Sequence, residues 1–143
     1  MFGLFSSKNQ KLVKKWQKEH EKIVELAHKV IGEYSKNNLK AAKKAVKELN
    51  SLAVDHVMNE DIEFYKLMRD EKRIDEKTEV LVDDFIKSFK QTKLTLMSFL
   101  SNYSKPDVPL DDEFFTTFNQ LVEILGERIE FEEKNLYSKL KDK

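Results

Sequence analysis

The residues best suited to chemistry in this chain form two pairs, His56 with Glu60 and Arg128 with Glu132. In both pairs the second residue follows four positions after the first, so in an α-helix the side chains lie one turn apart on the same face. The flanking apolar residues mark that face as the buried one. A non-haem metal site in a helical bundle needs imidazole and carboxylate groups that project inward from several helices. The first pair suits such a site, whereas the second has arginine where a histidine ligand would stand.

Four amphipathic segments carry these residues and must position them. They are expected over about residues 7–36, 39–69, 76–103 and 111–140. Asn37 and Asn38 break the first helix, the charged stretch 70–75 forms the second break, and Pro106 and Pro109 exclude a helix from the third. Because short connections make successive helices antiparallel neighbours, the sequence predicts an all-α, up-down-up-down antiparallel four-helix bundle.

The polar residues of these helices are expected to meet at one depth. His20 and His56 stand at similar distances from the first break, and the pair on the fourth segment reaches the same level from the other end. At about 1.5 Å per residue, the offsets agree to within roughly a turn or two. The predicted polar layer contains His20, His56, Glu60, Arg128 and Glu132. The third segment faces this layer with Phe89 and Thr92, neither of which is a good metal ligand.

The layer supports two chemical interpretations. His20, His56, Glu60 and Glu132 are four candidate metal ligands, which suffice for one ion and are few for a centre of two irons. Arg128 cannot be a ligand because its guanidinium stays protonated. In the alternative interpretation no metal is bound, and Arg128 compensates the charge of the two buried glutamates.

Composition bounds the class of protein. The 143 residues fit a single domain over 1–143, and the 26 basic and 26 acidic residues balance. This balance argues against a nucleic-acid-binding surface, and no apolar run approaches a membrane span. The chain has no cysteine, and its apolar start is too short for a signal peptide. We therefore expect a cytoplasmic protein, either a monomer or a weak homodimer.

Three segments resemble the hemerythrin-like (HHE cation-binding) family: KEH at residues 18–20, HVMNED at 56–61 and RIEFEEKNLY at 128–137. The resemblance implies a hemerythrin-like four-helix bundle. It also implies that His20, His56, Glu60 and Glu132 match ligand positions of the family. Two departures argue against reversible oxygen binding and di-iron chemistry, because Arg128 stands at the position of the family's fourth-helix histidine and the third segment contains no histidine.

A second resemblance is to bacterial anti-sigma regulators of the Rsd/AlgQ type. The segment QKLVKKW at residues 10–16 and the Arg128–Glu132 pair look similar to theirs. This resemblance implies a protein that binds a sigma-factor domain without using a metal for chemistry.

These observations lead to three functional hypotheses. The first is a non-enzymatic binding or sensory protein with at most one iron or other divalent ion, or none, at the four candidate ligands. The alternative is a metal-independent regulator that binds a protein partner such as a sigma factor. The third is a di-iron protein that acts on oxygen or nitric oxide or in redox chemistry.

Overall fold

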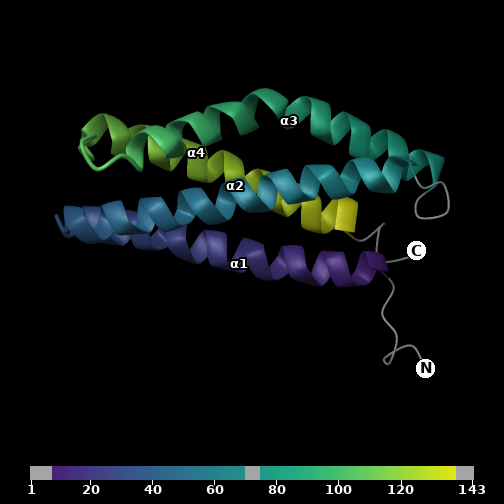
Figure 1. The fold of residues 1–143 in the computed structure, drawn as a ribbon, viewed down its shortest axis with the longest axis horizontal. Helices are drawn as coiled ribbons and strands as arrows, with labels where there is room; N and C mark the ends of the chain where they lie inside the picture. Colours follow the sequence, from purple (N-terminus) through teal and green to yellow (C-terminus); the bar gives the residue numbers. More distant parts are fainter. Residues whose placement is uncertain (1–7, 70–74, 138–143) are drawn as a thin grey trace.

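The computed structural model describes residues 8–69 and 75–137, which form a bundle of four helices (Figure 1). The helices are α1 (Lys8–Ser35), α2 (Leu39–Arg69), α3 (Glu76–Tyr103) and α4 (Asp112–Phe131), and a short π-helical segment, η1 (Glu132–Leu136), continues α4. Helix α1 packs against α2 and α4, and α2 packs against α3. The predicted all-α four-helix bundle is therefore confirmed. Within the described ranges, no helix has an apolar stretch long enough to cross a membrane.

The fourth helix differs from its expected form. Instead of a regular α-helix over residues 111–140, the backbone changes at Glu132 to π-helical hydrogen bonding, and the Tyr137 N–H donates to the Glu132 carbonyl five residues earlier. A π turn holds one more residue than an α turn, so it shifts the face on which later side chains lie. Residues 138–140 of the expected helix lie outside the described residues.

Two asparagines make the turn between α1 and α2. Asn37 adopts the left-handed conformation with φ of 61°, which asparagine tolerates better than most residues. The Asn38 N–H then donates to the Glu33 carbonyl at 2.9 Å and ends α1. The Asn38 side chain accepts a hydrogen bond from the Ala41 N–H at 3.3 Å and caps α2. This tight turn fixes the register in which α1 and α2 face each other.

Aspartate caps begin the other two helices. The Asp75 side chain accepts from the Thr78 N–H, and the Asp111 side chain accepts from the Phe114 N–H, each at 2.8 Å. The loop between α3 and α4 is held by Lys43 of α2, whose ammonium group donates to three carbonyls of the segment 103–108. These contacts set the ends of α3 and α4 relative to α2.

Two apolar clusters fill the bundle, one towards each end. The first cluster lies nearer the α1–α2 turn and includes Ile23, Val30, Leu49, Leu100 and Phe114. The second lies nearer the start of α3 and consists of Val13, Trp16, Phe64, Val82, Phe85, Leu136 and Tyr137. Along α1, α2 and α4, the predicted polar residues fall between the two clusters, so the polar layer is enclosed by apolar packing on both sides.

Candidate metal centre

The structure brings together the five residues expected in the polar layer. Their exposed fractions are 2% for His20, 3% for His56, 0% for Glu60, 6% for Arg128 and 1% for Glu132. One ligand atom from each of the two histidines and the two glutamates lies within 4.8 Å of the others. Three elements supply this group: α1 gives His20, α2 gives the His56–Glu60 pair, and η1 gives Glu132.

The two imidazoles face each other through their Nε2 atoms, which are 3.0 Å apart. On the outer side of each ring, Nδ1 is held by a carboxylate: Glu133 lies 2.9 Å from His20 Nδ1, and Glu19 lies 2.7 Å from His56 Nδ1. An Nδ1–H that donates to a carboxylate leaves Nε2 as the ligating nitrogen, an arrangement common behind metal-bound histidines. Sequence reasoning missed Glu19 and Glu133, although each directly neighbours a predicted ligand along the chain.

Each of the two buried carboxylates has one oxygen near a histidine and the other near Arg128. Towards the imidazoles, Glu60 Oε2 lies 3.4 Å from His56 Nε2, and Glu132 Oε1 lies 3.2 Å from His20 Nε2. Towards α4, Arg128 Nη2 lies 3.1 Å from Glu60 Oε1 and 3.7 Å from Glu132 Oε2. The carboxylates thus connect a histidine side of the layer with an arginine side.

Aromatic rings support the arginine side. The Arg128 guanidinium carbon lies 4.9 Å from the centre of the Phe85 ring and 5.4 Å from that of Phe89. Burial opposes the charge of Arg128, but Glu132 and Glu60 outweigh it and raise the pKa of the guanidinium. The expectation that α3 meets the layer with an aromatic side chain in place of a ligand holds for Phe89.

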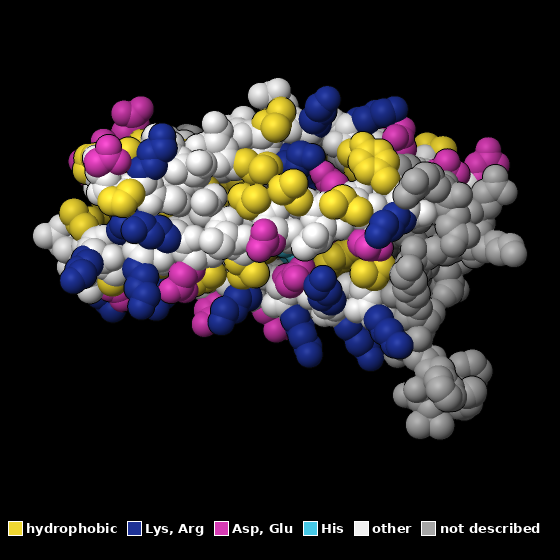
Figure 2. Space-filling model, viewed as in Figure 1, with side chains coloured by type: hydrophobic (Ala, Val, Ile, Leu, Met, Phe, Trp, Pro, Cys, Tyr) yellow, Lys and Arg dark blue, Asp and Glu magenta, His cyan; other side chains and the backbone are white. Residues whose placement is uncertain are grey.

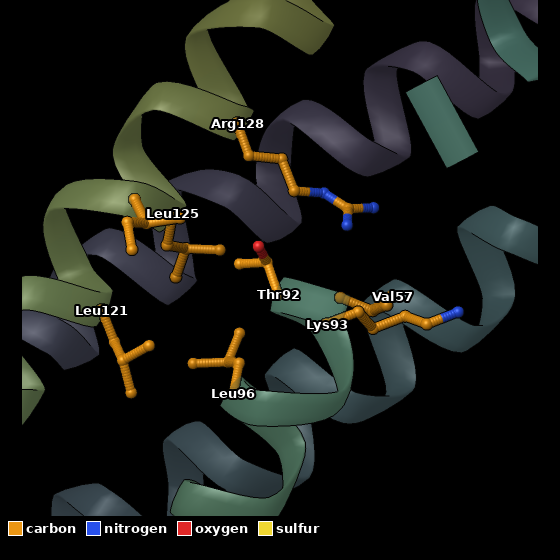
Figure 3. Close-up of a pocket in the computed structure, with 8 residues that line it drawn as sticks. Val57, Thr92, Lys93, Leu96, Leu121, Leu125 and Arg128 are labelled. Carbon is orange, nitrogen blue, oxygen red and sulfur yellow. The ribbon is translucent and has the colours of Figure 1, made fainter. Parts of the chain in front are cut away.

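A small apolar pocket, with room for about one water molecule, adjoins the arginine side between α3 and α4 (Figure 3). Its lining residues are Val57, Thr92, Lys93, Leu96, Leu121, Ile124, Leu125 and Arg128. Figure 3 shows Arg128 reaching from α4 over Thr92 of α3, with its guanidinium directed away from the leucines. Thr92, which was expected to face the layer, therefore lies at the pocket beside Arg128.

Tyr137 is a member of the site that sequence reasoning did not identify. Its hydroxyl donates to Glu60 Oε2 at 2.6 Å and lies 3.3 Å from His20 Nε2. Its ring is fully buried and stacks on Trp16 at 5.5 Å and on His20 at 5.6 Å between ring centres. Burial raises the pKa of Tyr137 far above its usual range, and the nearby Glu60 and Glu132 add to the shift. Without a cation, this phenol therefore stays protonated.

The two glutamates differ in acidity in the absence of a cation. Burial raises the pKa of Glu132 well above its ordinary value, and the neighbouring Glu60 raises it further. Burial also opposes the ionisation of Glu60, but hydrogen bonds with Glu132 and His56 and the charges of His56 and Arg128 lower its pKa overall. Of the two carboxyl groups, Glu60 is therefore the stronger acid and Glu132 the weaker one.

The two histidines likewise differ in their pKa values. Burial lowers the pKa of His20, and the adjacent His56 also lowers it, although hydrogen bonding to Glu133 acts against this. Burial would also lower the pKa of His56, but the hydrogen bonds and charges of Glu60 and Glu19 raise it overall. His56 is therefore the stronger base of the two facing rings and His20 the weaker one.

The donor chemistry of this cluster fits one metal ion. Four atoms that are acceptors in their ordinary unprotonated states, two imidazole Nε2 atoms and two carboxylate oxygens, converge in a volume sealed from water. Converging acceptors repel one another unless protons or a cation neutralise them. Glu132 Oε2 is in addition buried with no hydrogen-bond partner among the described residues. Two nitrogen and two oxygen donors are a set that iron, zinc and manganese accept.

Comparison with known proteins gives a single result. The family model for the hemerythrin HHE cation binding domain matches residues 11–140, which span every member of the polar layer. No curated protein and no solved structure matches the chain. The resemblance drawn from the three short sequence segments is thereby confirmed.

Proposed function

The chain belongs to the hemerythrin HHE cation-binding domain family, and we propose that it is a non-enzymatic binding or sensory protein that holds one metal ion. His20, His56, Glu60 and Glu132 would hold this ion, which we propose to be iron or another divalent metal. A bound ion would supply positive charge at the centre of the layer and, in the case of iron, a one-electron redox couple.

One observation carries the proposal. The Nε2 atoms of His20 and His56 lie 3.0 Å apart, and the outer nitrogen of each ring is paired with a glutamate. This arrangement aims two nitrogen lone pairs at one point, where Glu60 and Glu132 also place an oxygen. Apolar packing alone would not require inward-facing nitrogens supported from behind by carboxylates.

Arg128 is the reason for proposing one ion and not two. A second ion between the same carboxylates would need the oxygens Glu60 Oε1 and Glu132 Oε2, which lie 3.1 Å and 3.7 Å from the guanidinium. A guanidinium stays positive at all relevant pH values and repels a nearby cation. Arg128 therefore takes the electrostatic role that a second ion would have.

The enclosure of the centre supports a binding or sensory role. All four proposed ligands are buried, and an apolar cluster lies on each side of them. A substrate would have to displace packed side chains to reach the ion, whereas the loss or gain of the ion itself changes the charge of the core. Such a change is suited to reporting metal availability or redox state through the stability of the bundle.

Metal titration of the wild type and two variants tests this proposal. Wild-type protein stripped with chelator and titrated anaerobically with Fe²⁺ is expected to bind one ion per chain. His56→Gln is expected to bind Fe²⁺ far more weakly, and Arg128→His, which replaces the fixed cation with a ligand, is expected to bind up to two. Saturation of the wild type at two ions, or unchanged binding in His56→Gln, would refute the mononuclear site.

A second candidate function is binding of a protein partner such as a sigma factor, independent of metal. It is favoured by an apolar stripe on the outer face of α2, where Met58, Ile62 and Tyr65 are 51%, 50% and 52% exposed, with Leu94 of α3 also exposed. Figure 2 shows apolar side chains gathered over α2 and α3 on this face. Side chains of this kind favour the centres of protein interfaces.

The test of this second function is binding to a purified sigma-factor domain in the presence of chelator, measured by calorimetry. The paired substitution Met58→Glu and Ile62→Glu should abolish binding, whereas Lys44→Glu, elsewhere on the exposed side of α2, should not. Binding that disappears in chelator would contradict metal independence.

A further inference from the structure

The hydroxyl of Tyr137 lies among the proposed ligand atoms. Its oxygen lies 2.6 Å from Glu60 Oε2 and 3.3 Å from His20 Nε2, the very atoms that point towards the centre. The side chain is fully buried, so no water competes for these contacts. A phenol oxygen is thus the fifth potential donor in a cluster of two imidazoles and two carboxylates.

The backbone departs from α-helical geometry at the point that brings this oxygen in. In a regular α-helix, side chains five positions apart, such as Glu132 and Tyr137, would point about 140° apart around the axis. The π-helical bond from the Tyr137 N–H to the Glu132 carbonyl returns both residues to the buried face. Short π segments inside helices are frequent at functional sites.

Packing fixes the direction of the phenol ring. The Tyr137 ring stacks on Trp16 with an interplanar angle of 30° and on the His20 imidazole with an angle of 14°. The ring lies in the second apolar cluster, while its oxygen projects out of that cluster into the polar layer. A phenylalanine would fill the same space in the core, so the role of the hydroxyl lies in what it contacts in the polar layer, Glu60 and His20.

We propose that the oxygen of Tyr137 is a fifth ligand to the ion, and this inference rests on the proposed mononuclear site. When the ion binds, the O–H bond of Tyr137 breaks, an oxygen–metal bond forms and one proton leaves to solvent. A cation at the centre reverses the local field that otherwise keeps the phenol protonated. Because phenolate oxygen is a ligand of ferric iron in other proteins, Fe³⁺ is the form that this donor would stabilise most.

The experiment is reconstitution with Fe³⁺, read by visible absorption and by elemental analysis of the washed protein. Phenolate bound to ferric iron gives an intense visible charge-transfer band, which the wild type is expected to show at one iron per chain. Tyr137→Phe should lose the band and bind Fe³⁺ at least about tenfold more weakly. The matched control is Tyr34→Phe, because the Tyr34 hydroxyl also donates to a carboxylate, Asp112 at 2.9 Å, but lies outside the layer.

The outcomes separate this inference from the proposed function. One iron per chain without the band overturns the phenolate ligand and leaves the four-residue site standing, and so does a band that persists in Tyr137→Phe. No bound iron in the wild type overturns both. If Tyr137→Phe fails to fold, resonance Raman of the wild type decides: with ring-deuterated tyrosine, bands that shift under visible excitation support the ligand, and unshifted bands refute it.

Discussion

The charge of the buried polar groups is compensated differently on the two sides of the polar layer. On the arginine side, the negative charge of the buried carboxylates meets a permanent cation, Arg128, seated on the rings of Phe85 and Phe89. On the histidine side, the facing atoms are acceptors whose charge depends on protons or on a bound ion. The charge of the first side is fixed by the chain and that of the second can change, so changes in metal or pH should act first on the histidine side.

The largest expected effect comes from removing the fixed cation. Arg128→Met keeps a long apolar stem but leaves Glu60 buried beside no permanent positive charge. In metal-free protein it should lower the free energy of unfolding by about 3–5 kcal/mol, the range for breaking a buried ion pair. Urea denaturation in chelator measures this.

Lys87→Met is the matched control, because its ion pair with Asp83 is exposed and its loss should leave the free energy of unfolding nearly unchanged. Equal stability of Arg128→Met and the wild type would show that the guanidinium does not neutralise the carboxylates.

The next largest effect is expected from a change on the histidine side. His56→Gln removes one of two nitrogen ligands and should weaken Fe²⁺ binding by more than about 100-fold. This loss exceeds the roughly 10–100-fold expected when a residue that only supports a ligand is changed. His28→Gln is the control, because His28 lies exposed on the surface of α1 and should bind Fe²⁺ as the wild type does. Competition with a coloured chelator gives both affinities. Similar losses in the two variants would place the metal elsewhere.

A smaller effect is expected from the carboxylates behind the histidines. Glu133→Gln and Glu19→Gln remove the charge that orients each ring, and each should weaken metal binding by about 10–100-fold. Glu130→Gln, on the same helical run but paired with Lys134 at the surface, should leave affinity unchanged. If both variants matched Glu130→Gln, the hydrogen bonds at Nδ1 would have no part in metal binding.

The weakest perturbation is a change of pH. Burial opposes protonation of His56, yet Glu60 and Glu19 raise its pKa, so metal must displace a proton from His56 at pH values below that raised pKa. Affinity should therefore lose a further factor of about ten for each pH unit of acidification in this range, so its dependence on pH should be steeper below the pKa of His56 than above it. Metal titrations between pH 5 and 9 measure the slope. An affinity independent of pH would mean that His56 is not displaced from a protonated state.

Much of this layer was predictable because α-helices are regular. The spacing of His56 and Glu60 and the lengths on either side of the first break were enough to place them beside His20. Arg128 was also predictable as the charge partner of the glutamates. In each case the sequence encodes the position through a period of 3.6 residues and the length of a short turn.

Tyr137 was not predictable by the same reasoning. The regular period puts it off the face that carries Glu132, and only the π-helical hydrogen bond restores it. Glu19 and Glu133 were missed for a related reason. Glu19 directly precedes buried His20 and Glu133 directly follows buried Glu132, so helical spacing predicts that both face solvent. Their side chains instead bend back to the outer nitrogens of the histidines.

The metal content of freshly purified wild-type protein tests the central claim most directly. Elemental analysis, with the protein concentration taken from amino-acid analysis, should give one iron or other divalent ion per chain. Because Arg128 repels a second cation, this number should not rise when excess metal is supplied. Two ions per chain would contradict the role of Arg128, and no ion before or after metal is supplied would contradict the metal site itself.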